Sequence, residues 1–195
     1  SISKYKTDGD KGRVVTSDLQ STFDGIFGTS SSLAPSYLAS QGDITDIHAD
    51  VSIGNWSFDS WYWGLENGGS SGGAVQTLDH VGGESSDSFL SKLSYNNNDF
   101  SHWNIDANVS YYTIEADSYL VLFPAGATLP VGDDGNLFTP DMPEVAGGGL
   151  VSFTHGAIGN PIPSLDETRI NLANTYDGIE DHTFRFGAGW IESKL

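Results

Sequence analysis

The chain has 195 residues, of which 26 are acidic and only 8 are basic, so its formal net charge is −18. A chain of this length predicts one domain, and its 12 % of aromatic residues excludes a disordered chain. The absence of cysteine excludes a disulfide scaffold and a thiolate metal site, and the scarcity of Lys and Arg excludes direct contact with nucleic acid.

The first half of the chain shows alternating apolar and polar residues rather than a long helical period. Ile44 to Val51 is the clearest case, because Asp46, His48 and Asp50 alternate with apolar neighbours. This alternation predicts a strand with one apolar and one acidic face. In chain order, we expect a polar arm over residues 1–12, strands over 13–15, 44–51, 55–65 and 74–81, and a strand or helical turn over 87–93.

The second half continues the pattern, and clusters of Gly, Asn, Asp and Pro predict turns between the strands. We expect strands over residues 109–114, 119–123, 150–153, 168–172 and 183–191, turns at 66–69, 82–83, 96–98, 115–118, 133–135 and 177–178, and long loops at 68–73 and 140–149. About eight strands in one domain predict an all-β fold, a single jelly-roll β-sandwich or barrel over residues 13–195.

Two motifs suggest catalysis, but in both cases the surrounding sequence does not match what the catalytic motif requires. Ser71 lies in a G-x-S-x-G match, but a nucleophile elbow needs a helix after the serine, and a strand is expected there. Glu115 and Asp117 partly resemble the E-x-D-x-E strand of laminarinase-like glycosidases, but position 119 is Tyr and a turn is expected between the two strands. The sequence therefore predicts no catalytic residue and no enzyme.

Acidic clusters could bind a divalent cation. Asp46, His48 and Asp50 share one face of the expected strand, which suits several metals, although the solvated face of a half-buried strand is the commoner explanation. Residues 8–12 and 133–136 look like fragments of calcium loops without the glutamate that closes an EF-hand loop. We predict no metal and no cofactor.

The densest aromatic segment of the chain is the best candidate for binding. Trp56 and Phe58 fall on one face of the expected strand, whereas Trp61 and Trp63 fall on the other, with Tyr62 between them. Three interpretations remain open: both faces are covered by the protein's own core, the rings form an oligomer interface, or they form a stacking platform for sugar.

The charge also predicts the solvent in which the protein works. Asp outnumbers Glu 19 to 7, and Lys occurs only five times. A surface at −18 repels itself in dilute buffer, whereas at about 1 M salt the Debye length falls to about 3 Å and the repulsion largely vanishes. The composition is therefore typical of a halophilic protein.

The polar start of residues 1–12, the eight-strand pattern, the acidic surface and the Gly-rich loops together resemble the small major capsid protein of tailless icosahedral viruses of haloarchaea. The resemblance implies a structural protein of the virion, a single upright jelly roll that assembles laterally with itself and with a sister capsid protein. It also implies assembly in the host cytoplasm, which agrees with the lack of a signal peptide at the start of this sequence, and a final position near the internal viral membrane.

The five Trp residues exceed what a simple wall element of a capsid requires. They support the alternative function, a carbohydrate-binding module or lectin, with or without calcium. The two functions differ in where the aromatic strand faces, because a lectin exposes it to solvent and a capsid subunit covers it with its core or with a neighbour.

Overall fold

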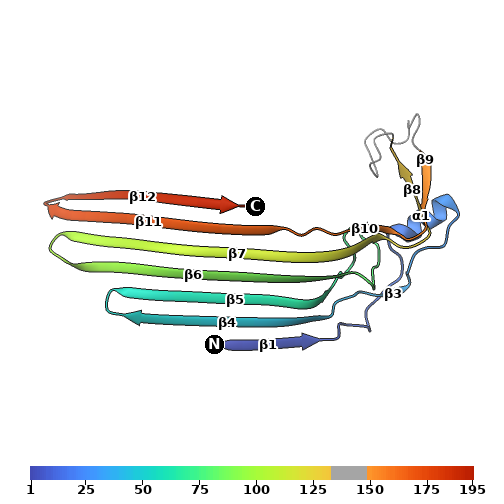
Figure 1. Ribbon diagram of the computed structural model, residues 1–195, viewed down its shortest axis with the longest axis horizontal. Helices are drawn as coiled ribbons and strands as arrows, with labels where there is room; N and C mark the ends of the chain where they lie inside the picture. The colour runs from blue at the N-terminus through green and yellow to red at the C-terminus, as the bar shows by residue number, and fades with distance from the viewer. Residues whose placement is uncertain (133–148) are drawn as a thin grey trace.

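The computed structural model describes residues 1–132 and 149–195, and it is dominated by one large antiparallel sheet (Figure 1). The strands of this sheet follow the order β1-β4-β5-β6-β7-β11-β12, and β10 pairs with the end of β7. Their bounds are β1 Ile2–Thr7, β4 Gly42–Ile53, β5 Trp56–Gly69, β6 Gly83–Phe100, β7 Trp103–Phe123, β10 Ala157–Gly159, β11 Ser164–Ile179 and β12 His182–Lys194. The all-β prediction is confirmed, and the eight-strand sheet is consistent with a β-sandwich or jelly-roll type of fold.

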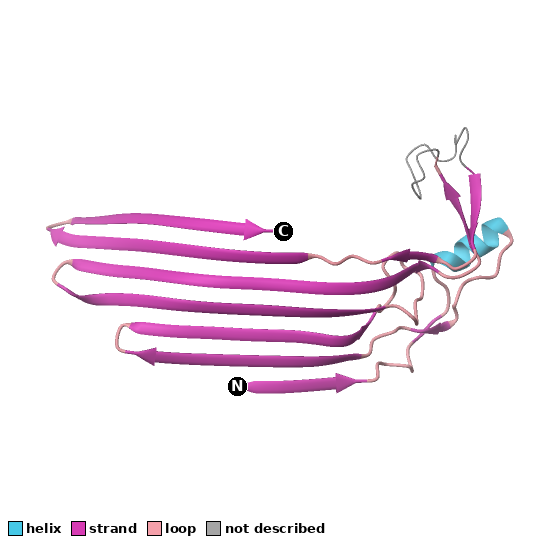
Figure 2. Cartoon of the chain, in the orientation of Figure 1, coloured by secondary structure: helices cyan, strands magenta, loops and turns pink. Residues whose placement is uncertain are grey.

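Tight hairpins join most of the long strands, and these turns all lie at the same end of the sheet (Figure 2). They connect β4 to β5, β6 to β7, and β11 to β12. Each turn contains one residue with positive φ, namely Gly54, His102 or Asp181. We call this the hairpin end of the sheet, and the opposite end, where the helix lies, the helix end.

The helix end contains the compact part of the molecule. Its elements are α1 (Leu19–Phe27), β2 (Val14–Val15), β3 (Ser36–Tyr37), β8 (Ala127–Val131) and β9 (Gly149–Phe153), with β2 paired to β3 and β8 to β9. A small apolar core joins α1, β8 and β9 to the ends of β7 and β10; it is formed by Phe123, Ala127, Leu129 and Ala157, with Phe23 of α1 and Phe153 of β9 packed against it. α1 has only nine residues, so its sequence shows no long helical period.

Asp18 starts α1 and ties it to a distant loop. Its carboxylate accepts hydrogen bonds from the Ser21 backbone N–H at 2.8 Å, from the Ser32 hydroxyl at 2.6 Å and from the Leu78 backbone N–H at 2.9 Å. Burial raises the pKa of this carboxyl, but these hydrogen bonds favour the ionised form and outweigh burial, so the pKa lies below its usual value. Gly28, at φ 71°, ends the helix in the left-handed conformation.

The expected strand over residues 74–81 is wrong, because this segment is a loop folded around two buried side chains. Asp79 is 2 % exposed and accepts hydrogen bonds from the backbone N–H groups of Val81, Gly82 and Val121. Thr77 is also buried and donates its hydroxyl hydrogen to the Leu122 carbonyl. These polar bonds replace the ladder that a strand would have formed.

Other expected boundaries change because the strands are longer than their apolar segments. Residues 115–118 continue β7 instead of forming a turn, residues 96–98 continue β6, and residues 66–69 continue β5 with a bulge after Leu65. Residues 87–93 are strand, and residues 177–178 lie in β11 at a bulge. All six residues of β1 fall within the expected polar arm and pair with β4. The turn expected at 133–135 lies outside the described residues, as does nearly all of the loop expected at 140–149.

The long strands have almost no buried apolar core of their own. Among the described residues, the buried hydrophobic side chains are Ala39, Leu78, Phe123, Ala127, Leu129 and Ala157. None of these lies in the half of the sheet nearer the hairpin turns, which we call the hairpin half. Over that half, the described part of the chain supplies one layer of strands and no second layer, as Figure 1 shows. Both faces of this half are therefore open to solvent in the isolated chain.

Candidate assembly surface

The strand register aligns apolar residues of six strands in single rows. Residues that lie directly opposite each other in an antiparallel pair project from the same face of the sheet. One row runs Val51, Phe58, Leu93, Val109, Ile170 and Trp190 across β4, β5, β6, β7, β11 and β12. The row two residues nearer the hairpins runs Ile53, Trp56, Tyr95, Ala107, Leu172 and Ala188. Both rows occupy one face because side chains alternate along a strand.

These rows, with the aromatic residues nearest the turns, form a continuous surface that we call the apolar face. Aromatic rings on neighbouring strands contact each other across this face, with 4.8 Å between the centroids of Trp56 and Tyr95 and 4.6 Å between those of Trp103 and Tyr176. Tyr95 and Tyr176 are half-buried, but twelve of its large side chains are more than one third exposed in the isolated chain: Val51, Ile53, Trp56, Phe58, Leu93, Trp103, Val109, Ile170, Leu172, Phe184, Phe186 and Trp190. Ile53 reaches 75 % and Phe186 reaches 60 %.

The opposite face of the same half is polar. Its rows include Asp50, Asp59, Lys92, Ser110 and Arg169, followed by Ser52, Ser57, Ser94, Asn108 and Asn171. Asn171 donates a side-chain hydrogen bond to Asn108 at 3.0 Å, and Ile191 is the exposed apolar exception. The two central rows of the hairpin half are thus apolar on one face, whereas the rows behind them on the other face are mostly polar and include Asp50, Asp59, Lys92 and Arg169.

The register divides the aromatic segment as its alternation predicts. Trp56 and Phe58 belong to the apolar face and are 51 % and 41 % exposed, and Tyr62 projects from the same side nearer the helix end. Trp61 and Trp63 project from the other side, where both are half-buried. These five residues therefore do not form one cluster, and only two of them join the larger apolar face.

Asp46 and His48 pack around Trp61 on this second side. The Trp61 indole N–H donates to Asp46 Oδ2 at 3.0 Å, and His48 Nε2 lies 3.0 Å from Asp46 Oδ1. The His48 and Trp61 rings stack with 5.8 Å between centroids. Both carboxylate oxygens of Asp46 therefore have protein partners, and within residues 1–132 and 149–195 no group of three or more metal-ligating side chains comes together.

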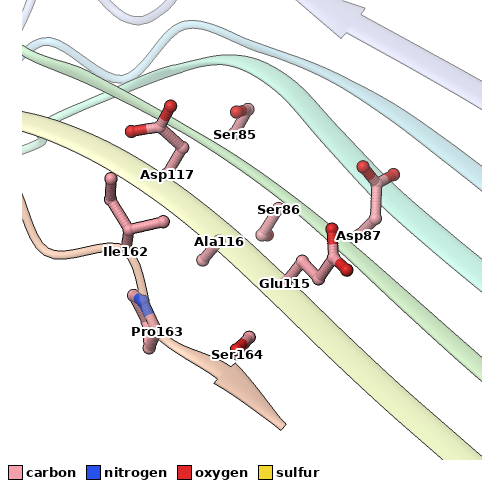
Figure 3. A pocket seen from close by; sticks show the side chains of 9 residues that line it. All are labelled: Ser85, Ser86, Asp87, Glu115, Ala116, Asp117, Ile162, Pro163 and Ser164. Atoms are coloured by element: carbon pink, nitrogen blue, oxygen red, sulfur yellow. The ribbon is translucent and has the colours of Figure 1, made fainter. Parts of the chain in front are cut away.

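An acidic hollow lies toward the helix end (Figure 3). Asp87, Glu115 and Asp117 line it from β6 and β7, with Ile162 and Pro163 on the opposite side. Asp87 and Glu115 are directly paired across the strands, and the Tyr62 hydroxyl donates to Asp87. The pKa of the Tyr62 hydroxyl is raised, mainly by that hydrogen bond and to a smaller extent by burial.

Ser71 is fixed by its backbone. It forms an isolated bridge with Ala39, in which each residue donates its N–H to the other's carbonyl, at 2.7 Å from Ser71 and 3.3 Å from Ala39. Ser71 has φ 54°, and the residues after it form turns rather than a helix. The strand–turn–helix setting of a nucleophile elbow is therefore missing here.

The exposed area of the whole chain is far above that of a compact monomer. The chain exposes 12293 Å². A folded monomer of 20.8 kDa exposes about 8,900 Å², so the excess is about 3,400 Å². Large obligate interfaces cover about 1,000–2,500 Å² on each partner, so the excess exceeds what one such interface needs.

Comparisons with known proteins give no relative: no family model, no curated protein and no solved structure matches the chain. In the described ranges, no helix has the length and apolar character needed to cross a bilayer.

Proposed function

We propose that this chain is a structural subunit of a viral capsid, which assembles with copies of itself and with a sister capsid protein in high salt. The observation that carries the proposal is the apolar face, which lies open on the isolated chain. Exposed contiguous apolar surface of this extent marks a contact with another molecule. The assignment to a capsid rests on the resemblance of the sequence to small haloarchaeal capsid proteins.

The edges of the sheet support lateral assembly. β12 forms one edge over thirteen exposed residues, and on the other side β1 covers β4 only from Gly42 to Ile47. The stretch of β4 from His48 to Ile53 therefore has one free edge within the described chain, apart from the contact of His48 with Ser1. Unpaired backbone groups on an edge bind further strands readily, so both edges offer sites for neighbours.

The charge supports assembly in brine. Copies at −18 repel each other strongly at low ionic strength, and salt screens this repulsion. Apolar contacts, in contrast, are not weakened by screening of charge. We therefore expect the assemblies to form at high salt and to dissociate as the salt is removed.

A salt series tests the proposal. Sedimentation velocity at about 1 M NaCl and at about 0.1 M NaCl compares Debye lengths of about 3 Å and about 10 Å. We expect oligomers at the higher salt, a shift toward monomer at the lower salt, and closed particles by electron microscopy when a sister capsid protein is supplied. A chain that stays monomeric at every salt concentration would contradict an assembly function.

A carbohydrate-binding role is the second candidate, and the exposed Trp56, Trp103 and Trp190 on one flat face favour it. Aliphatic neighbours such as Val51 and Ile170 offer a sugar ring no stacking surface, so the composition of the face fits a protein partner better. Binding on a glycan array that disappears with Trp56→Ala would support the carbohydrate role. A blank array, with and without calcium, would remove it.

A further inference from the structure

We propose that a second copy of this chain covers the apolar face, so that two sheets pack face to face and complete a β-sandwich between two molecules. The inference rests on the proposed assembly function and names the surface and the partner that it uses. Each copy supplies one of the two layers. The pair thereby adds a second layer over the hairpin half of each sheet.

The shape and composition of the face fit a packed sheet. Two sheets that pack face to face lie about 10 Å apart and interdigitate the side chains of their inner faces. The two central rows supply Val, Phe, Leu, Ile and Trp from six strands, and none of the paired positions in these rows is charged. This is the composition of half a sandwich core.

Charge favours a second copy over an acidic surface such as an anionic bilayer. Two chains at −18 that meet through their apolar faces keep Asp50, Asp59 and the other charges of the polar face on the two outer surfaces. High salt screens the repulsion that remains between them. A self-complementary face also closes with two-fold symmetry, in which the same patch serves both partners.

The exposed surface area of the chain is consistent with a second copy as the partner. A standard interface covers about 800 Å² on each partner, and obligate dimers cover more. The excess surface of about 3,400 Å² per chain is large enough for an obligate interface on the apolar face and for lateral neighbours at the edges. A compact monomer would show no such excess.

Adjacent residues on β11 provide a matched pair of variants. Ile170 lies in the central row of the apolar face and is 48 % exposed, whereas Asn171 projects from the polar face and is also exposed. Ile170→Lys and Asn171→Lys add the same charge to the same strand. At about 1 M NaCl, we expect Ile170→Lys to weaken self-association at least about tenfold in sedimentation equilibrium, because a lysine in an apolar interface loses its hydration. Asn171→Lys should associate like the wild type.

Cross-linking provides a readout that does not depend on disrupting the interface. The chain has no cysteine, so Val109→Cys or Ile170→Cys introduces its sole thiol, with Ser110→Cys and Asn171→Cys as controls on the opposite face. A short bismaleimide should trap covalent dimers from the first pair and not from the second. Sites nearest the two-fold axis should give the highest yield.

The outcomes separate the inference from the proposed function. Oligomers that persist unchanged in Ile170→Lys, or equal cross-linking from both faces, would overturn the face-to-face pair and leave assembly intact. A wild-type chain that is monomeric at all salts would overturn both. Flotation of monomeric wild type with phosphatidylcholine vesicles, lost in Ile170→Lys, would assign the face to lipid and also overturn the pair.

Discussion

Three pairs of acidic side chains face each other directly across neighbouring strands, one of them being Asp43 of β4 and Glu66 of β5. Asp50 of β4 lies opposite Asp59 of β5, and Asp87 of β6 lies opposite Glu115 of β7. Like charges in directly opposed positions destabilise a sheet. Asp59 also faces Lys92, which offsets part of its charge, whereas Asp50 lies on the part of β4 that β1 does not cover. Because salt screens the repulsion within each pair, these pairs make the stability of the sheet depend on the salt concentration.

We expect Asp50→Asn to raise the melting temperature at about 0.1 M NaCl and to leave it unchanged at about 1 M NaCl, where screening has already removed the repulsion. Differential scanning calorimetry at the two salt concentrations measures this. Asp181→Asn is the matched control, because it removes the same charge in a hairpin turn whose φ of 59° asparagine also tolerates. Equal shifts for both variants would show that only net charge matters.

At the scale of elements, β12 is the most exposed strand of the sheet. All thirteen of its residues are exposed, and its register with β11 is continuous from Asp166 to Tyr176. In an antiparallel strand, successive residues direct their backbone N–H and C=O groups alternately toward the partner and away from it. Of Gly187 and Ala188, one therefore directs its N–H toward β11 and the other toward the open edge.

Proline substitutions at these two positions distinguish a loss of sheet stability from a loss of lateral assembly. We expect one of Gly187→Pro and Ala188→Pro to lower the melting temperature by removing a hydrogen bond to β11, and the other to preserve it while lateral assembly is lost. Melting curves and sedimentation at about 1 M NaCl provide the two measurements. Gly187→Ala and Ala188→Ser retain the N–H and serve as controls. Normal assembly in both proline variants would show that this edge is not used.

The same elements show what the sequence could predict. The alternation in β4 placed Asp46, His48 and Asp50 on one face correctly, because a period of two is a local property. The polar residues at 115–118 suggested a turn, yet β7 runs through them: Glu115 and Asp117 stay exposed, whereas the backbone N–H groups of Ala116 and Ser118 donate to the carbonyls of Pro163 and Pro161. The apolar face could not be read from any one strand, since it needs the register of six strands from separate parts of the chain.

At the scale of the whole molecule, folding and association are linked. The core at the helix end is small, and the described hairpin half buries no large apolar side chain of its own. An isolated long sheet with two open faces lacks the apolar burial that offsets the loss of chain entropy. Much of the stability of this protein is therefore expected to come from contacts between copies.

Linkage of this kind makes the melting temperature depend on protein concentration, because binding between folded chains stabilises them by mass action. At about 1 M NaCl, we expect the melting temperature to rise with each tenfold increase in concentration. Circular dichroism at a series of concentrations tests this, with Ile170→Lys as the comparison in which the dependence should be weaker. A melting temperature independent of concentration in the wild type would indicate a chain that is stable alone.

The order of the strands along the chain has a consequence for synthesis. Each of β5, β6, β7 and β12 pairs with the strand that is synthesised just before it, and β12 is the last strand of the described sheet. β12 carries Phe184, Phe186 and Trp190, so the apolar face reaches its full width only when this last strand of the sheet pairs with β11.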